Sequence, residues 1–369
     1  MNYAPLSSAG SPSFSAIVGV GGIGTGTLVE LEGHHTLERT ESRLGKLLDA
    51  RDYCKLHIVE HYLAVLLNTG PRKSGCRVVA VGNVGSDEAG TRLLHEMKQA
   101  GIDTQHVLIE PGCRTLFSVS FLYPDKSSSN VTISNSAAAE LGKAQLDACR
   151  TELGALGARG IALCLPEVPL SARTRFLKIA TDSGSFRAAS FAAGEMDEVR
   201  RLNLLTSVDL LAVNREEAAA LGGVDGSAAQ RDLLEQCRNA AAAMNPDIRL
   251  VVSSGSEGVD VLDQGTWRHR RALPVNVVST AGAGDALLAG ILAGLVLGLP
   301  LVSGEQDNAA QTATDLGLLV AAFSLTSQHT IHPGFNLEAL RSFAAARHSS
   351  LLLDGHGVGP DGRSLANPR

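Results

Sequence analysis

The sequence predicts an α/β fold in which a mostly parallel central sheet is flanked by helices on both faces. Short apolar runs alternate with longer segments of helical periodicity, which is the order expected of parallel strands joined by crossover helices. The chain has 369 residues, 44% of them hydrophobic, and this is enough to fill a core on both sides of one large sheet.

The individual elements follow from this alternation. The apolar runs predicted as core strands are residues 17–20, 78–84, 160–165, 188–191, 210–213 and 250–253. The segments with helical spacing are residues 52–67, 88–100, 170–183, 196–205, 215–221 and 228–244. A further apolar run, residues 286–299, is too short to span a membrane and predicts a buried core helix.

A second, smaller group of strands is predicted outside the main alternation. Residues 116–123 and 131–133 read as two strands separated by a polar turn at 124–130. Together with the segment after Gly26 they predict a small β sheet, which we assign to residues 21–35 and 113–135. Residues 1–14 are rich in Ser, Pro and Gly and predict a disordered end, and residues 351–369 predict a flexible tail.

A glycine-rich turn stands directly before the predicted core helix. Residues 279–285 read Ser-Thr-Ala-Gly-Ala-Gly-Asp. Such a turn at a helix N-terminus leaves backbone N–H groups unpaired beside the positive end of the helix dipole, so Gly282, Ala283 and Gly284 predict an anion site. Asp285 beside a bound anion is suited to take a proton from an attacking hydroxyl. The alternative is that Asp285 only caps the helix.

This turn resembles the C-terminal signature of the ribokinase-like (PfkB) family of sugar and nucleoside kinases. That signature is an acidic residue, Thr, any residue and Gly-Ala-Gly-Asp; Thr280 and residues 282–285 match it, and Ser279 replaces the acidic residue. Other segments similar to the family follow in the family's order, at residues 16–19, 78–90, 101–104, 214–217 and 251–258. The resemblance implies a ribokinase-like three-layer sandwich with one kinase domain over residues 15–350 and the small sheet as a lid.

The resemblance also implies the activity, its cofactors and part of the site. It implies an ATP-dependent phosphotransferase that moves the γ-phosphate to an alcohol hydroxyl of a sugar or nucleoside, with Asp285 as base. Asn214 and Glu217 match the family's Asn-x-x-Glu motif, which organises magnesium and phosphate. The residues implied to hold the nucleotide are Asn214, Glu217, Ser254, Gly255, Ser256, Gly258 and Thr280. The cofactors implied are ATP and Mg²⁺, and a monovalent-cation requirement stays open.

The acceptor side departs from the family pattern. Family members carry a Gly-Gly-x-x-x-Asn-x-Ala segment that touches the sugar, but residues 51–62 contain neither the glycine pair nor the Asn. The residues predicted to contact the acceptor are Gly21, Gly22, Thr25, His57, Arg114 and Asn135. Because His57 and His61 share one helical face, a metal pair at this position is an alternative.

Composition limits the partners. A net charge of −6 offers no broad basic surface, so a nucleic-acid partner is not expected. The six cysteines show no C-x-x-C spacing, which favours reduced thiols and a cytoplasmic location. No membrane span or signal peptide is predicted. By analogy with relatives, a homodimer that pairs through the lids is expected.

The sequence is also compatible with two other functions. Residues 19–24 formally fit the G-x-G-x-x-G fingerprint of a Rossmann-type NAD-dependent oxidoreductase, which requires a helix to begin immediately afterwards. Residues 28–32 look instead like a strand. The other alternative is a ribokinase-like protein that binds a sugar or nucleoside without catalysis. The missing glycine pair favours this binder, whereas the intact Gly-Ala-Gly-Asp turn disfavours it.

Overall fold

The computed structural model describes residues 13–33, 36–48, 52–70, 75–125, 128–303 and 312–347. Its centre is a nine-stranded sheet with the order β14-β13-β12-β11-β10-β9-β1-β5-β6. In chain order these strands are β1 (Ala16–Val20), β5 (Arg77–Gly85), β6 (Asp103–Glu110), β9 (Gly160–Cys164), β10 (Phe186–Ala189), β11 (Leu210–Asn214), β12 (Arg249–Ser253), β13 (Val259–Asp263) and β14 (Thr266–Arg270). The strands from β12 to β6 are parallel, and β13 and β14 add an antiparallel edge.

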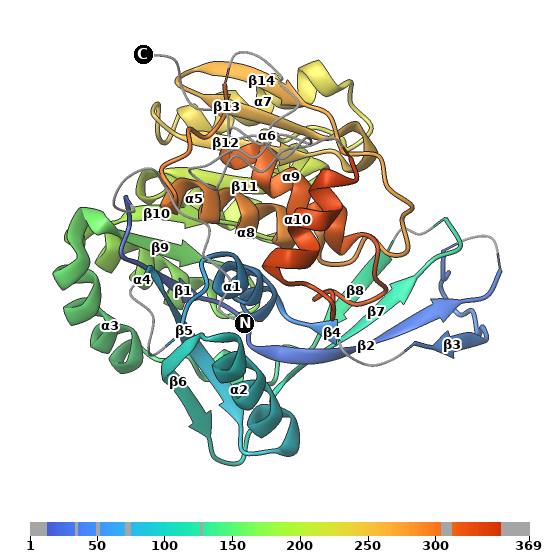
Figure 1. The fold of residues 1–369 in the computed structure, drawn as a ribbon, viewed down its shortest axis with the longest axis horizontal. Helices are drawn as coiled ribbons and strands as arrows, with labels where there is room; N and C mark the ends of the chain where they lie inside the picture. Colours follow the sequence, from blue (N-terminus) through green and yellow to red (C-terminus); the bar gives the residue numbers. More distant parts are fainter. Residues whose placement is uncertain are drawn as a thin grey trace, which may run out of the picture.

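Helices cover both faces of this sheet, so the fold has three layers (Figure 1). They are α1 (Lys55–Leu66), α2 (Glu88–Ala100), α3 (Lys143–Leu156), α4 (Leu170–Ser183), α5 (Met196–Arg201), α6 (Arg215–Gly222), α7 (Gln230–Ala242), α8 (Ala283–Val296), α9 (Ala313–Ser324) and α10 (Leu337–Ala345). Successive side chains of a strand point to opposite faces, so Ile17 packs in the cluster with α1, α8 and α9, while Val18 and Val20 pack in the cluster with α3 to α7.

A second sheet extends from one side of the large one (Figure 1). It has the order β3-β2-β7-β8, with β4 paired to β2. Its strands are β2 (Gly24–Leu31), β3 (Gly45–Leu47), β4 (Asp52–Tyr53), β7 (Leu116–Leu122) and β8 (Ser128–Thr132). We call this sheet the lid sheet. β2 continues directly from the carboxyl end of β1, and α1 begins directly after β4, so the lid sheet is attached where the central parallel strands end.

Several predicted elements differ from the structure. α1 begins at Lys55 and not at residue 52, because Asp52 and Tyr53 pair with β2. The edge strands β6 and β14 and the helices α3, α9 and α10 have no counterpart among the predicted elements. Residues 1–12 of the predicted end at 1–14, the predicted tail at 351–369, and residues 34–35 and 126–127 of the predicted lid lie outside the described residues. In the part of the chain that the structure describes, no helix is long and apolar enough to cross a membrane.

Candidate active site

The N-terminus of α8 lies in a tight turn. Gly282, the residue before the helix, has a left-handed backbone with φ of 77°. A Cβ atom at this position would lie 2.9 Å from the carbonyl oxygen of Thr330, so the turn packs closely against the segment after α9. Only glycine meets both conditions without strain. The turn therefore has a fixed place relative to the rest of the fold.

The backbone amides of this turn are only partly used by the protein. The Ala283 N–H donates to the Thr280 carbonyl at 3.3 Å, whereas no protein partner is found for the amides of Gly282, Gly284 and Asp285 among the described residues. The amides without a partner stand at the positive end of the α8 dipole. The turn is thus suited to an anion, although the Ala283 amide, which was expected to contribute, is already engaged.

Asp285 lies in the first turn of α8 and faces one cation. The Nζ atom of Lys55 is 3.6 Å from Oδ1 of Asp285, and the exposed fractions of the two side chains are 36% and 15%. Burial raises the pKa of Asp285, and the Lys55 ammonium opposes this rise. In turn, Asp285 is the largest cause of a raised pKa for Lys55. The Lys55 ammonium therefore favours the ionised form of this partly desolvated carboxylate, against the effect of burial.

Glu167 joins this group from the connection between β9 and α4. Its Oε2 atom accepts a hydrogen bond from the Lys55 backbone N–H at 2.9 Å. Burial raises the pKa of Glu167 to about 7, and Lys55 opposes the rise. Sequence reasoning missed this residue. The one available signal was a carboxylate just after a buried parallel strand, where ligands commonly bind in open α/β sheets.

Asp52 brings another carboxyl group to the lid side of the site. It is 5% exposed, and the Ser120 hydroxyl donates to its Oδ2 atom at 2.7 Å. Burial raises the pKa of Asp52, while hydrogen bonds from Ser120 and Thr330 oppose the rise. The pKa of Asp52 is also raised by the charge of Asp285, so the two carboxyl groups lie within electrostatic reach of each other. From the sequence, Asp52 was expected at the start of a helix, close to a conceivable polar acceptor site around His57 and His61.

Asn214 and Glu217 occupy the start of α6. The Asn214 side chain accepts from the Glu217 N–H at 2.9 Å, and the Glu217 carboxylate accepts from the Asn214 N–H at 2.8 Å. This reciprocal pair is a capping box, so both residues are needed for the helix start. Burial raises the pKa of Glu217, with Lys55 opposing it. Glu217 therefore lies within electrostatic reach of Lys55 and Asp285.

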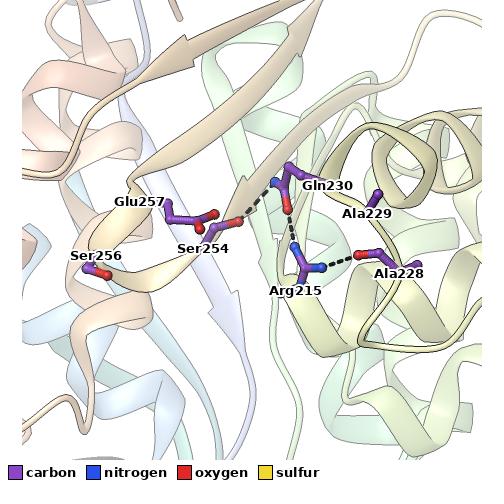
Figure 2. A pocket seen from close by; sticks show the side chains of 7 residues that line it. All are labelled: Arg215, Ala228, Ala229, Gln230, Ser254, Ser256 and Glu257. Atoms are coloured by element: carbon purple, nitrogen blue, oxygen red, sulfur yellow. Dashed lines mark hydrogen bonds between the residues drawn. The ribbon is translucent and has the colours of Figure 1, made fainter.

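The turn between β12 and β13 borders a cavity of about 350 Å³. Figure 2 shows Ser254, Ser256 and Glu257 on one side of this cavity and Arg215 and Gln230 on the other. Gln230 donates to the Ser254 hydroxyl at 3.1 Å, and its amide oxygen accepts from Arg215. The turn predicted to hold the nucleotide is thereby tied to the starts of α6 and α7.

The glycines of this turn have a structural reason of their own. Gly255 and Gly258 have positive φ angles of 57° and 106°. A Cβ atom on Gly258 would lie 2.1 Å from the carbonyl oxygen of Arg270, so the turn packs against β14. Thr280, the remaining residue implied to hold the nucleotide, is exposed just before the glycine turn of α8.

The predicted acceptor contacts divide into exposed and buried residues. Arg114, just before β7, and Asn135, just after β8, are both exposed at the open end of the β7–β8 hairpin. Thr25 is buried in β2, where it donates to the Asp52 carbonyl at 3.2 Å and accepts from Arg92 at 3.0 Å. The expectation for His57 is wrong for this conformation, because its side chain is 1% exposed.

His57 is packed inside the protein. Its ring lies 4.6 Å from the ring of Tyr53, edge to face, and 6.1 Å from that of His61. Burial lowers the pKa of His57 well below its usual value and lowers that of His61 to about 4. In the described ranges, no group of three or more His, Cys, Asp or Glu side chains could hold a metal ion. The alternative of a histidine metal pair therefore finds no third ligand there.

Gly21 and Gly22 allow close packing at the base of the site. A Cβ atom on Gly22 would lie 2.5 Å from Cβ of Glu167, and one on Gly21 would lie 3.0 Å from Cβ of Leu165. The element that follows these glycines is the strand β2, which begins at Gly24. A dinucleotide site of the Rossmann type needs a helix there, so the structure contradicts the oxidoreductase alternative.

Comparison with known proteins places this geometry in a family. A model of the pfkB family of carbohydrate kinases matches residues 69–334. The chain belongs to this family. Of the curated relatives, a ribokinase from Haemophilus influenzae is 26% identical over 261 residues, which cover 69% of this chain and 77% of that protein. A fructokinase from Klebsiella pneumoniae is 36% identical over 114 residues, 31% of this chain and only 33% of the relative.

Solved structures agree on the fold. The ribokinase from Giardia lamblia superposes with a TM-score of 0.73 at 13% identity, covering 89% of this chain and 99% of that chain. The ribokinase from Arabidopsis thaliana complexed with ribose and ATP superposes with a TM-score of 0.62 at 20% identity, covering 91% of this chain and 99% of that chain. The predicted family, the ribokinase-like α/β fold and the assignment to the carbohydrate kinases are confirmed.

Proposed function

We propose that this kinase transfers the γ-phosphate of ATP to an alcohol hydroxyl of a sugar or nucleoside, with Asp285 as the general base. The observation that carries the proposal is the place of Asp285 in the first turn of α8, beside amides without a protein partner among the described residues. A carboxylate there repels a bound phosphate, so it is a costly choice unless it takes a proton from the attacking hydroxyl. Phosphoryl transfer needs mainly alignment and charge neutralisation, which the turn and Lys55 can supply.

The donor side of the site is assigned from the same geometry. Ser254, Ser256 and Thr280 supply hydroxyl groups near the nucleotide, and the amides of the glycine turn face the γ-phosphate. Asn214 and Glu217 would hold Mg²⁺, largely through water, because this ion keeps most of its hydration shell. One carboxylate at the start of a helix, facing a phosphate site, fits that mode of binding. When bound, the ion supplies neutralisation of the phosphate charge.

The acceptor is expected between the α8 turn and the lid sheet. Arg114 and Asn135 are exposed at that sheet and remain proposed acceptor contacts, and Gly21 and Gly22 allow the backbone to approach. Closing the lid sheet over the acceptor would exclude water, which competes for the phosphoryl group. A cytoplasmic location is part of this proposal and follows from the reduced cysteines that the sequence favours.

The proposed function is tested by ADP release with ATP and Mg²⁺ against a panel of sugars and nucleosides. We expect turnover with at least one acceptor, and a phosphate monoester of that acceptor detected by mass spectrometry. A non-catalytic binder would instead shift its melting temperature with an acceptor while releasing no ADP. If no acceptor is phosphorylated although ATP binds, the assignment of a kinase activity to this chain is wrong.

We also propose that two copies pair through the outer face of the lid sheet. The pairing register places Leu47, Phe117, Val119 and Val131 on one face, and Leu47, Phe117 and Val131 are exposed. An exposed apolar face of this kind is typical of an interface. Sedimentation velocity is expected to give a dimer for the wild type and a monomer for Val131→Lys. A wild-type monomer at micromolar concentration contradicts the pairing.

A further inference from the structure

The helix α1 begins without a cap of its own. Cys54, the residue before the helix, makes no side-chain capping hydrogen bond, and the first turn contains no acidic residue. The missing acceptor comes from a distant part of the chain, because Glu167 accepts the Lys55 N–H at 2.9 Å. A carboxylate at a helix N-terminus is favoured both as a hydrogen-bond acceptor and by the helix dipole. Glu167 therefore caps α1 from the connection between β9 and α4.

The backbone of Glu167 has a conformation that residues other than glycine rarely adopt. Glu167 has a φ of 74°, in the left-handed region. Glu167 packs against Gly22. A Cβ atom on Gly22 would lie only 2.5 Å from the Glu167 Cβ, so a glycine is needed at this position. The Gly22 N–H also donates to the Pro166 carbonyl at 3.0 Å. The costly conformation at Glu167 is thus fixed by its neighbours, as is common at functional sites.

The result of this arrangement is the position of the Lys55 ammonium. The side chain of Lys55 leaves the capped first turn of α1 and ends 3.6 Å from the Asp285 carboxylate. The other titratable groups coupled to Lys55 or Asp285 among the described residues are carboxyl groups, one phenol and one thiol: Asp52 on β4, Cys54 before α1, Tyr62 on α1, Glu167 before α4 and Glu217 on α6. Among these coupled groups of the described residues, Lys55 carries the positive charge, and most of the others are carboxyl groups.

We propose that Lys55 is a positioning residue that keeps Asp285 ionised and oriented toward the acceptor hydroxyl, and that Glu167 holds Lys55 in place by capping α1. The proposal rests on the role of Asp285 as the base, proposed above. Removing the ammonium leaves Asp285 partly buried among other carboxyl groups, and both conditions favour its protonated form. A protonated Asp285 cannot accept the proton of the acceptor.

The test measures the protonation of Asp285 directly, in the full-length protein. Aspartate labelled with ¹³C at the side-chain carboxyl is titrated by NMR, and the Asp285 signal is identified by its loss in Asp285→Asn. In Lys55→Met we expect the midpoint of the Asp285 titration to rise by about one to three pH units. Lys55→Arg restores it. In Glu167→Gln, which keeps an acceptor for the α1 amide but removes a nearby negative charge, the midpoint should not rise. The acid limb of kcat against pH moves in the same direction as the titration midpoint.

A matched control separates this effect from a general loss of charge. Lys178→Met removes an exposed lysine on α4 whose Nζ lies 3.4 Å from Asp182, and it should leave the Asp285 titration unchanged. The inference is overturned if Lys55→Met titrates Asp285 at the wild-type pH. Failure of the proposed function looks different, because then the wild type phosphorylates no acceptor, whatever the titration of Asp285. A Lys55→Met protein that does not fold is replaced by Lys55→Gln in the same titration.

Discussion

Replacing Asp285 with Asn is expected to lower kcat by about 10² to 10⁴-fold, the contribution that a positioned general base makes. Asn keeps the size of the side chain and its capacity for hydrogen bonds, but it cannot accept a proton at neutral pH. Lys55 loses its partner at 3.6 Å, while the amides of the α8 turn are unchanged. The loss should therefore fall on turnover, with the affinity for ATP retained. Initial rates of ADP release and calorimetric titration with ATP measure the two effects.

The matched control for this change is Asp232→Asn. Asp232 is also an acidic residue in the first turn of a helix, α7, and its side chain is exposed. If the only role of a first-turn carboxylate were to favour the helix, the two variants would lose similar stability and neither would lose much activity. Turnover of Asp285→Asn within a factor of about three of the wild type, far less than a base contributes, would show that Asp285 is a helix-capping residue and not the base.

Replacing Gly290 with Ala is expected to destabilise the protein by about 1 to 3 kcal/mol, the usual cost of overpacking a core. The helices α8 and α9 are in close contact where Gly290 meets Gly317. A Cβ atom on Gly290 would lie 2.6 Å from Cα of Gly317 and 2.9 Å from the carbonyl oxygen of Leu316, both of them backbone atoms. The helices must therefore separate. Because α8 carries Asp285, turnover should fall together with the free energy of unfolding in urea.

Gly154 offers the opposite case in the same type of element. It lies inside α3, and nothing stands within 4 Å of a Cβ atom built on it. Gly154→Ala should stabilise the protein by about 0.5 to 1 kcal/mol, because alanine is the better helix former. If Gly290→Ala is as stable as Gly154→Ala, the close approach of α8 and α9 is not a condition for this fold.

Elements with strong local signals could be predicted from the sequence. α2 runs over Glu88–Ala100 as predicted, because Asp87 caps its start and Gly101 ends it in the left-handed conformation. The buried strands β1 and β5 were evident from their apolar runs. The edge strand β6 was not, because five of its eight residues are polar and only Val107 is buried. Asp52 and Tyr53 read as part of a helix, and only pairing with β2 makes them a strand.

The candidate site divides in the same way. Asp285 and its glycine turn are contiguous in sequence, so their geometry follows from local rules about helix starts. The contact between Lys55 and Glu167 joins residues 112 positions apart and cannot be read from spacing. His57 shows the converse error. Its helical spacing from His61 suggested a polar site, but that face of α1 packs against Tyr53 in the interior.

The central claim is that the N-terminus of α8 receives the terminal phosphate while Asp285 receives the acceptor's proton. A crystal structure of the Asp285→Asn variant with ATP, Mg²⁺ and a phosphorylatable acceptor tests it most directly, because this variant should hold the reactants without converting them. We expect the γ-phosphate within hydrogen-bond distance of the Gly282 and Gly284 amides, and an acceptor hydroxyl against residue 285. A γ-phosphate bound elsewhere, or a hydroxyl directed away from residue 285, would contradict the account.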